Sequence, residues 1–149
     1  MTGTKFVYIT YIRAPVEKIF DALTKPEITR RYWAADCEQK TDWKKGSPWA
    51  IVTLDGRKLD EGEVLEFDRP RKFSVSWQHL DDAEMKAEGI SRWTCELEQH
   101  GSVVKVTLTH ENGAENSKLI GAVSQGWQSM LSALKTWLET GEPIAEFMQ

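Results

Sequence analysis

The longest regular pattern of apolar residues covers residues 117–140. Apolar positions recur there at alternating steps of three and four, the spacing that places side chains on one face of an α-helix. Asn116 or Ser117 is suited to cap the start of this helix, and Gly141 and Pro143 are suited to end it. Its apolar face would consist of Leu119, Ile120, Val123, Trp127, Met130, Leu131, Leu134, Trp137 and Leu138. The helix would be roughly 35 Å long, and no other helix of that length is expected, so this face must pack on a sheet.

The first part of the chain predicts one strand and two short helices. Residues 6–12 are rich in β-branched and aromatic side chains, which is typical of strands. Pro15 at the first helical position and Glu17 in the first turn favour a helix after this strand. Pro26 repeats the signal for a second helix, which ends near residues 30–33. Both helices are too short to carry a core alone, so they are expected to form a small separate layer.

Between residues 36 and 109 the period of the pattern changes to two, which is typical of antiparallel strands with one buried face. The candidate strands are 36–42, 48–54, 60–68, 71–78, 90–99 and 102–109. Asp55-Gly56 and His100-Gly101 predict hairpin turns, because glycine accepts the positive φ angles of such turns. The second and third candidates do not alternate clearly, so their inward faces cannot be assigned. Residues 80–89 are polar and predict a mobile loop.

Three strands alternate cleanly and define the face that is expected to be buried. Their inward residues are Phe73, Val75, Trp77, Trp93, Cys95, Leu97, Val104, Val106 and Leu108. The order of elements is one strand, two short helices, six strands and one long helix. This order predicts an α+β fold of the helix-grip type, in which a curved seven-stranded antiparallel sheet surrounds the C-terminal helix.

Composition narrows the class of protein. A chain of 149 residues with 40% hydrophobic and 28% charged residues suits a single globular domain, 1–149. The formal charge is 19 − 23 = −4 with both signs scattered, which gives no reason to expect a nucleic acid or an anionic membrane as partner. No apolar run approaches the ~20 residues of a membrane span, so no membrane insertion is expected. Cys37 and Cys95 form no CxxC pattern, which favours reduced thiols and a cytoplasmic location.

Both ends of the chain carry a family resemblance. Residues 12–27 (IRAPVEKIFDALTKPE), followed by Arg31-Tyr32-Trp33, resemble the start of the START-like SRPBCC superfamily. Residues 126–143, with Gly126-Trp127 and the closing LETGEP, are similar to its branch homologous to the C-terminal domain of activators of heat-shock-protein-90 ATPase. The resemblance covers nearly the whole chain and implies the helix-grip fold. The superfamily includes lipid carriers, plant hormone and pollen-allergen proteins and polyketide cyclases, so it implies no single function.

The resemblance also bears on the partner. Eukaryotic activators that this branch resembles carry a separate N-terminal domain that contributes to chaperone binding. With the first strand expected at residue 6, we expect no such domain here. A stand-alone small-molecule-binding protein is therefore favoured over a chaperone activator.

The motifs of common catalytic and cofactor sites are not found. Ser124 lies in a GxxSxG stretch inside the predicted helix, which favours a surface serine over a nucleophile. The sequence contains no dinucleotide-binding or phosphate-binding glycine motif. His79, His100 and His110 lack the spacing of metal ligands. We therefore predict no catalytic residue, no metal and no cofactor.

Two polar residues remain candidates for contact with a ligand. His110 continues the inward register of residues 104–108 and could bond a ligand or act as an acid or base near neutral pH. The alternative, which we favour, is that the strand ends at Thr109 and His110 is a polar loop residue. Arg31 could attract an anionic ligand if the short helices form the mouth of a pocket, whereas surface charge is the commoner role of such an arginine.

The seven tryptophans are the main functional signal. For any single one we favour a core position, but for the group a packed aromatic core and a ligand cavity stay equally open. Gly126 removes side-chain volume beside the apolar face of the long helix, which favours a cavity. Trp43 lies in a lysine-rich turn and is expected to be partly exposed.

The hypothesis from the sequence is a protein that holds a hydrophobic or aromatic molecule between its sheet and its terminal helix. The expected cavity residues are Trp33, Trp77, Trp93, Trp127, Met130 and Leu134, with His110 and Arg31 as polar contacts at the openings. One alternative is a cyclase-like or hydrolase-like enzyme, for which His110 is the single acid–base candidate. Another is a module for chaperone interaction or homodimerisation, which an exposed Trp43 and a hydrophobic sheet edge would favour.

Overall fold

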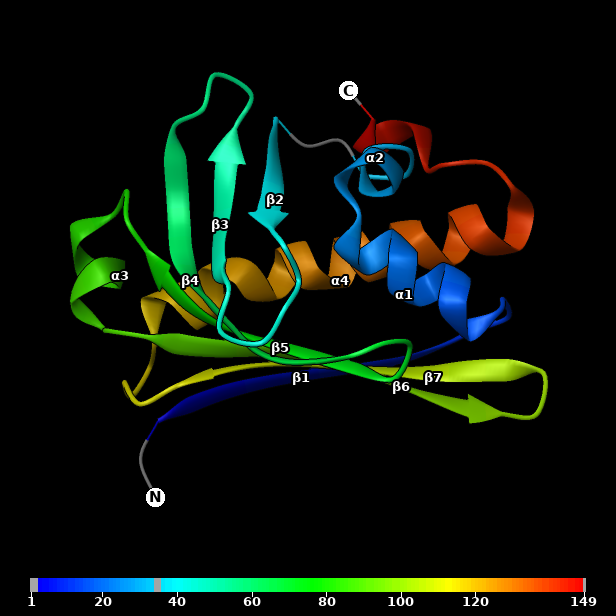
Figure 1. Ribbon diagram of the computed structural model, residues 1–149, viewed down its shortest axis with the longest axis horizontal. Helices are drawn as coiled ribbons and strands as arrows, with labels where there is room; N and C mark the ends of the chain where they lie inside the picture. The colour runs from blue at the N-terminus through cyan, green and yellow to red at the C-terminus, as the bar shows by residue number, and fades with distance from the viewer. Residues whose placement is uncertain (1–2, 34–35, 149) are drawn as a thin grey trace.

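A computed structural model describes residues 3–33 and 36–148. Seven antiparallel strands form one sheet in the order β1-β7-β6-β5-β4-β3-β2, and the long helix α4 lies across one side of it (Figure 1). The strands are β1 (Thr4–Ile12), β2 (Cys37–Thr41), β3 (Pro48–Thr53), β4 (Lys58–Asp68), β5 (Lys72–His79), β6 (Ser91–His100) and β7 (Val103–Asn112). The helices are α1 (Val16–Thr24), α2 (Pro26–Thr29), α3 (Ala83–Ala87) and α4 (Lys118–Thr140), followed by a 3-10 turn (Ala145–Phe147). The predicted helix-grip fold is confirmed.

The ends of α4 form as the sequence predicts. Ser117 is the N-cap, and its hydroxyl accepts a hydrogen bond from the Ile120 amide at 3.1 Å. Gly141 ends the helix in the left-handed conformation, with φ of 83°, and its N–H donates to the Trp137 carbonyl at 2.8 Å. Leu131 and Leu134 on the inner face of the helix are fully buried. The helix is therefore anchored at both ends and along one face.

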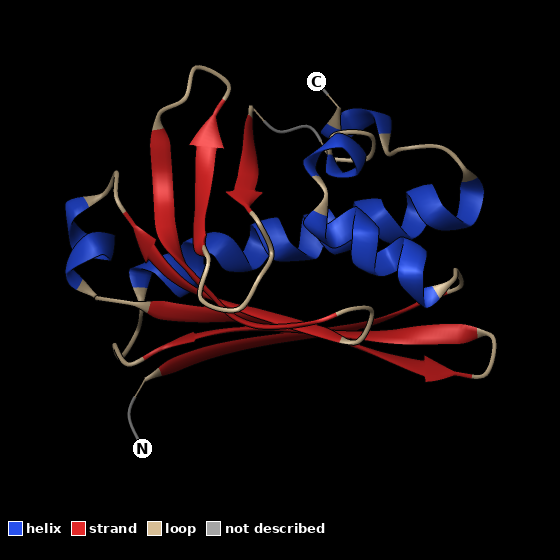
Figure 2. Ribbon diagram, viewed as in Figure 1, coloured by secondary structure: helices blue, strands red, loops and turns tan. Residues whose placement is uncertain are grey.

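The sheet bends sharply in the middle of β4. Figures 1 and 2 show β2, β3 and the first part of β4 standing steeply against the remaining strands. At the bend the pairing of β4 with β5 shifts register between Val64 and Glu66. The backbones also approach closely there, because a Cβ atom placed on Gly62 would lie 1.8 Å from the Ser76 carbonyl oxygen. The bend carries β2 and β3 around α4, and the register shift explains why residues 60–68 show no clear alternation.

The predicted loop at residues 80–89 is wrong, because this segment contains helix α3. The Asp82 carboxylate accepts hydrogen bonds from the amides of Glu84 and Met85, both at 3.0 Å, and so caps α3. Glu88 then accepts from the Lys118 amide at 2.7 Å, at the positive end of the α4 dipole. The polar residues of this segment thus secure the start of the long helix.

Three smaller expectations are corrected. Strand β7 continues through His110 to Asn112, so the favoured placement of His110 in a loop is wrong. Pro15 is the N-cap of α1 and not its first helical residue. Gly126 is exposed, with open space around its Cβ position, so it removes no volume from the core.

Within residues 3–33 and 36–148, no helix combines the length and apolar character required to cross a bilayer.

The two glycines Gly62 and Gly126 give opposite predictions for stability. Gly62→Ala forces β4 away from β5 and is expected to destabilise the fold by about 3 kcal/mol. Gly126→Ala removes backbone freedom inside an exposed helix face and is expected to stabilise it by about 0.5–1 kcal/mol. Urea unfolding followed by tryptophan fluorescence measures both changes. Equal small effects of the two substitutions would contradict the close approach of β4 and β5.

Candidate functional site

A cavity of about 140 Å³ lies between the short helices, the β2–β3 strands and the inner face of α4. Helices α1 and α2 form one wall, β2 and β3 form a second, and the indoles of β6 and α4 form the floor. The bend of the sheet creates this arrangement, because it raises β2 and β3 opposite α2 (Figure 2). The residues that line the cavity are Leu23, Pro26, Thr29, Arg30, Trp33, Cys37, Glu38, Gln39, Ile51, Leu54, Trp93, Trp127 and Met130.

The floor of the cavity is a pair of stacked tryptophans. Trp93 of β6 and Trp127 of α4 lie with ring centroids 4.7 Å apart and an angle of 17° between the rings. Their exposed fractions are only 2% and 8%, so the rings are fixed by packing and do not move freely. Met130 lies one helical turn after Trp127 and extends the floor with a flexible apolar side chain. The floor therefore suits a flat or greasy group.

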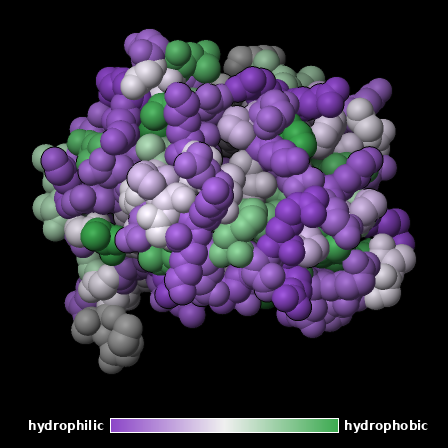
Figure 3. Space-filling model, in the orientation of Figure 1, coloured by the Kyte–Doolittle hydropathy of each residue, from purple (hydrophilic) through white to green (hydrophobic). Residues whose placement is uncertain are grey.

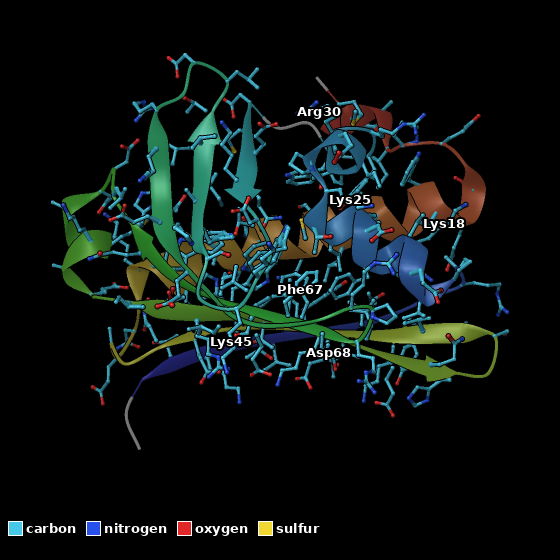
Figure 4. The ribbon with its side chains drawn as sticks, viewed as in Figure 1. Lys18, Lys25, Arg30, Lys45, Phe67 and Asp68 are labelled. Carbon is cyan, nitrogen blue, oxygen red and sulfur yellow. The ribbon has the colours of Figure 1, made fainter. Side chains whose placement is uncertain are left out.

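The lining contains one pair of oppositely charged side chains. Arg30 and Glu38 form an ion pair that joins the end of α2 to β2. Leu54, which is 75% exposed, lies on the same lining. Figure 4 shows Arg30 beside α2, on the side of the molecule where β2 begins and β3 ends. We take this end as the mouth of the cavity. Cys37 also lines the cavity, and burial raises the pKa of its thiol, which makes it a weak nucleophile.

One donor in the floor has no partner. The indole N–H of Trp93 is buried and makes no hydrogen bond within the described part of the chain. The Cys95 thiol is close to this N–H, but the two groups do not form a hydrogen bond of acceptable geometry. Burial raises the pKa of the thiol, and the Trp93 indole opposes this shift in part. A buried donor without a partner costs roughly 1–3 kcal/mol, so this N–H is a local cost of packing the Trp93 ring in the floor.

His110 is buried beneath the floor and has both ring nitrogens in hydrogen bonds. The Trp127 indole N–H donates to Nδ1 at 3.1 Å, which requires Nδ1 to be an acceptor. The Nε2–H then donates to the Ser91 hydroxyl at 2.8 Å, and that hydroxyl donates to the Trp77 carbonyl at 2.9 Å. Burial lowers the pKa of His110 to about 3, so the ring is neutral at physiological pH. This histidine positions Trp127 and is not available as an acid or base.

A second buried polar contact supports the neighbouring indole. Asp60 is 5% exposed, and its carboxylate accepts from the Trp77 indole at 2.8 Å and from the His79 ring at 2.7 Å. Burial raises the pKa of Asp60, and the contact with His79 opposes this shift. Trp77 in turn packs edge-on against Trp127, with centroids 5.7 Å apart. The aromatic cluster is thus held in place by hydrogen bonds at two points.

The structure brings four of the eight predicted cavity residues to the lining: Trp33, Trp93, Trp127 and Met130. The other four lie elsewhere. Trp77, His110 and Leu134 are buried behind the floor. Arg31 does not line the cavity, and its guanidinium carbon lies 6.0 Å from the centre of the Trp137 ring. The ligand contacts assigned to all eight stay predictions.

Trp43 is partly exposed, as the sequence predicts, but its ring faces inward. Its indole N–H donates to the Thr24 carbonyl at 3.0 Å, and the ring packs edge-on against Phe73 at a centroid distance of 5.1 Å. It therefore gives little support to a surface for protein partners.

Several lining residues of the cavity are missed by the sequence pattern. Ile51 and Leu54 of the cavity wall lie near a second register shift, between Ile51 and Val52, where alternation fails. Arg30 stands next to Arg31 in the sequence, and the turn after α2 decides which of the two arginines lines the cavity. In the described residues no cluster of three histidine, cysteine or carboxylate side chains could hold a metal ion.

Comparison with family models identifies the class of protein. Residues 13–139 match the family described as "Activator of Hsp90 ATPase homolog 1-like protein". The chain belongs to this family, which is part of the START-like SRPBCC superfamily. Comparison with curated protein sequences gives no match.

Solved structures share the fold. A Cytophaga hutchinsonii protein is 28% identical with a TM-score of 0.73, and the match covers 95% of this chain and 97% of that one. The Aha1 dimer from Colwellia psychrerythraea is 23% identical with a TM-score of 0.68, over 93% and 98% of the two chains. CalU16 from Micromonospora echinospora is 21% identical with a TM-score of 0.72, over 93% and 78%. At these low identities the last two establish the fold alone.

The neutral state of His110 predicts a pH dependence of stability. The unfolded chain protonates this side chain as the pH falls through its ordinary pKa of 6.5, whereas the folded protein does not until about 3. The contribution of His110 to the free energy of unfolding is therefore present in full well above pH 6.5 and is lost as the pH falls. The loss amounts to about 2 kcal/mol between pH 7 and pH 5. His110→Gln keeps an acceptor and a donor but does not titrate, so it should remove this share of the loss.

Urea unfolding at pH 7 and pH 5 measures this difference between the wild type and the variant. His100→Gln, which replaces an exposed histidine of the same sheet, is the matched control. A wild-type pH dependence retained in His110→Gln would show that His110 is not held neutral by burial.

Proposed function

We propose that the protein binds a small hydrophobic or aromatic molecule in the cavity between α1, α2, β2, β3 and α4. The observation that carries the proposal is the apolar cavity of about 140 Å³ above the stacked Trp93 and Trp127 rings. Rigid aromatic walls with few polar groups are typical of sites for apolar ligands. The two cysteines are free thiols in the structure, which supports a cytoplasmic location as part of this proposal.

The volume limits the size of the buried group. Pockets for drug-sized ligands measure roughly 300–1,000 Å³, whereas apolar cavities of about 150 Å³ accept benzene. The cavity of about 140 Å³ therefore suits one aromatic ring or a short branched aliphatic group. A longer ligand would extend past Leu54 into solvent. It would separate the side chains of Arg30 and Glu38, which form an ion pair there.

The geometry does not favour an enzyme built on His110. That residue was the acid–base candidate of the sequence, and it lies behind the floor with both nitrogens in hydrogen bonds. The charged residues of the lining are Arg30 and Glu38, and they neutralise each other in an ion pair at the mouth. Membership of the family does not by itself assign chaperone activation, because one fold serves many functions.

Toluene and phenol are suitable probes, since each carries one ring. We expect either probe to change the tryptophan fluorescence and the NMR shifts of the floor, with a Kd on the order of 0.1–1 mM. Met130→Trp fills the cavity and should abolish both responses.

The matched control is Leu138→Trp, which adds the same side chain to α4 at a half-buried position outside the lining. This variant should bind the probes like the wild type. Failure of both probes to perturb the floor residues, in a wild-type protein that is folded by circular dichroism, would refute the proposed site.

A second candidate function is homodimerisation. The Colwellia relative was solved as a dimer. In this chain three large apolar side chains of β1 are exposed, namely Val7 at 47%, Ile9 at 47% and Tyr11 at 45%. Surfaces of this kind often mark contacts between protein chains. Multi-angle light scattering between about 1 and 100 µM is expected to show twice the mass of one chain at the upper end, and a single-chain mass throughout would exclude this candidate.

A further inference from the structure

Strand β1 is an open edge of the sheet. It pairs with β7 on one side, and among residues 3–33 and 36–148 no strand pairs with its other side. Along an antiparallel strand, successive residues direct their backbone N–H and C=O groups to opposite edges. The Tyr11 carbonyl points to the open edge, because it accepts from Lys135 Nζ of α4 at 2.6 Å. Lys5, Val7 and Ile9 share that direction, so a row of backbone donors and acceptors faces outward.

This edge lacks the features that usually protect an edge strand. Residues 4–12 contain no proline and one charged side chain, Lys5, and the pairing with β7 runs through all nine residues without a register shift. The end near Tyr11 and Arg13 is closed by side chains of α4, since Glu139 accepts from the Arg13 amide at 2.8 Å. The open part of the edge is therefore the segment 5–9.

We propose that two copies of the chain pair through this segment, antiparallel, about a two-fold axis at Val7; the proposal rests on the second candidate function above. In that register Val7 lies opposite Val7 of the second copy, and Lys5 lies opposite Ile9. All three residues direct their backbone groups to the open edge, so the three pairs gain two hydrogen bonds each. An axis at Tyr8 would instead pair Lys5 with Tyr11, whose carbonyl already accepts from Lys135.

Side chains on both faces of the strand fit the same register. On the outer face the two Val7 side chains meet, and each Ile9 packs on the aliphatic stem of Lys5. On the inner face Phe6 lies opposite Tyr8 of the second copy. Phe6 and Tyr8 are half-buried and already stacked within one chain, with centroids 6.5 Å apart, so pairing would gather four rings.

The neighbouring face of α4 carries no charge that would oppose the approach of a second copy. Helix α4 packs mainly on β1, so it would lie near its counterpart when the edges join. From residue 119 to residue 134 the helix has no charged side chain. Its exposed positions there are Gly121, Ala122, Gln125, Gly126, Gln128 and Ser132. The Cα atoms of the two Lys5 residues would lie about four residues, or about 14 Å, apart. At that distance salt screens the repulsion between their ammonium groups.

In Figure 3 the visible face is mainly hydrophilic, with its hydrophobic residues in small separate groups. A second copy fits β1 better than an unrelated strand does, because the segment 5–9 is complementary to itself about its central residue. Self-complementarity of this kind is the property of a two-fold interface.

Cysteine cross-linking tests both the surface and the register. Residues in a hydrogen-bonded antiparallel pair have Cα atoms about 5.5 Å apart, within the range of about 4.4–6.8 Å that a disulfide spans. Val7→Cys is expected to give a disulfide-linked dimer on mild oxidation, seen by non-reducing electrophoresis. Ile9→Cys alone should not, because its copies lie about four residues apart, whereas the double variant Lys5→Cys/Ile9→Cys should. The wild type, with Cys37 and Cys95, is the background control.

A charge variant provides the second measurement. Val7→Lys places two like charges at the axis and is expected to shift the protein to a single-chain mass in light scattering. Ile90→Lys is the matched control, since Ile90 is also exposed, at 66%, and lies away from β1. Circular dichroism checks that both variants fold.

The outcomes separate the two proposals. A dimer that persists in Val7→Lys and is not cross-linked by Val7→Cys overturns the β1 interface and leaves homodimerisation standing. A wild type with a single-chain mass throughout overturns both. Cross-linking by Ile9→Cys but not by Val7→Cys overturns the register.

Discussion

The contact between Trp127 and Trp93 fixes the position of the long helix on the sheet. The two rings stack with centroids 4.7 Å apart, and the indole N–H of Trp127 is bound by His110 of β7. A sliding or rotating helix would break the stack and leave a buried donor and a buried acceptor without partners. His110 can play this part only while neutral, and its burial keeps it so. The hydrophobic face of α4 thus gives the attraction, and one polar contact selects the register.

The cavity follows from the same contact together with the bend of β4. Flat, rigid rings pack closely on one another but cannot follow the curvature of the walls above them. The close approach of Gly62 to Ser76 and the register shift beyond it raise β2 and β3 away from these rings, toward α2. The space between the rings and the raised strands stays unfilled by Leu23 and Met130. Its apolar walls are therefore a consequence of the fold, and its size of about 140 Å³ limits what can enter.

The sequence predicted the fold well where the chain is regular. The spacing of apolar residues in α4, its Ser117 and Gly141 caps, and the inward faces of β5, β6 and β7 all follow from local periodicity and are confirmed. It predicted the cavity less well, because half of the wall belongs to β2 and β3. Register shifts break the period of β3 and β4, and position in the fold, not pattern, brings Ile51 and Glu38 to the lining. The buried partner of Trp77, Asp60, gave no signal, since a lone acid in a strand is more often exposed.

The inner and outer faces of helix α4 take part in different contacts, so the cavity and the proposed dimer interface use different residues of the helix. Trp127 and Met130 lie on the inner face, beneath the cavity, while the uncharged outer positions of the same helix are exposed. A partner that packs beside α4 would hinder any outward movement of the helix. Ligands would then have to enter at the other end, between α2 and β2, where the Arg30–Glu38 pair crosses the mouth. An exposed ion pair contributes only about 0–1 kcal/mol, so it can open readily for a ligand without loss of the fold.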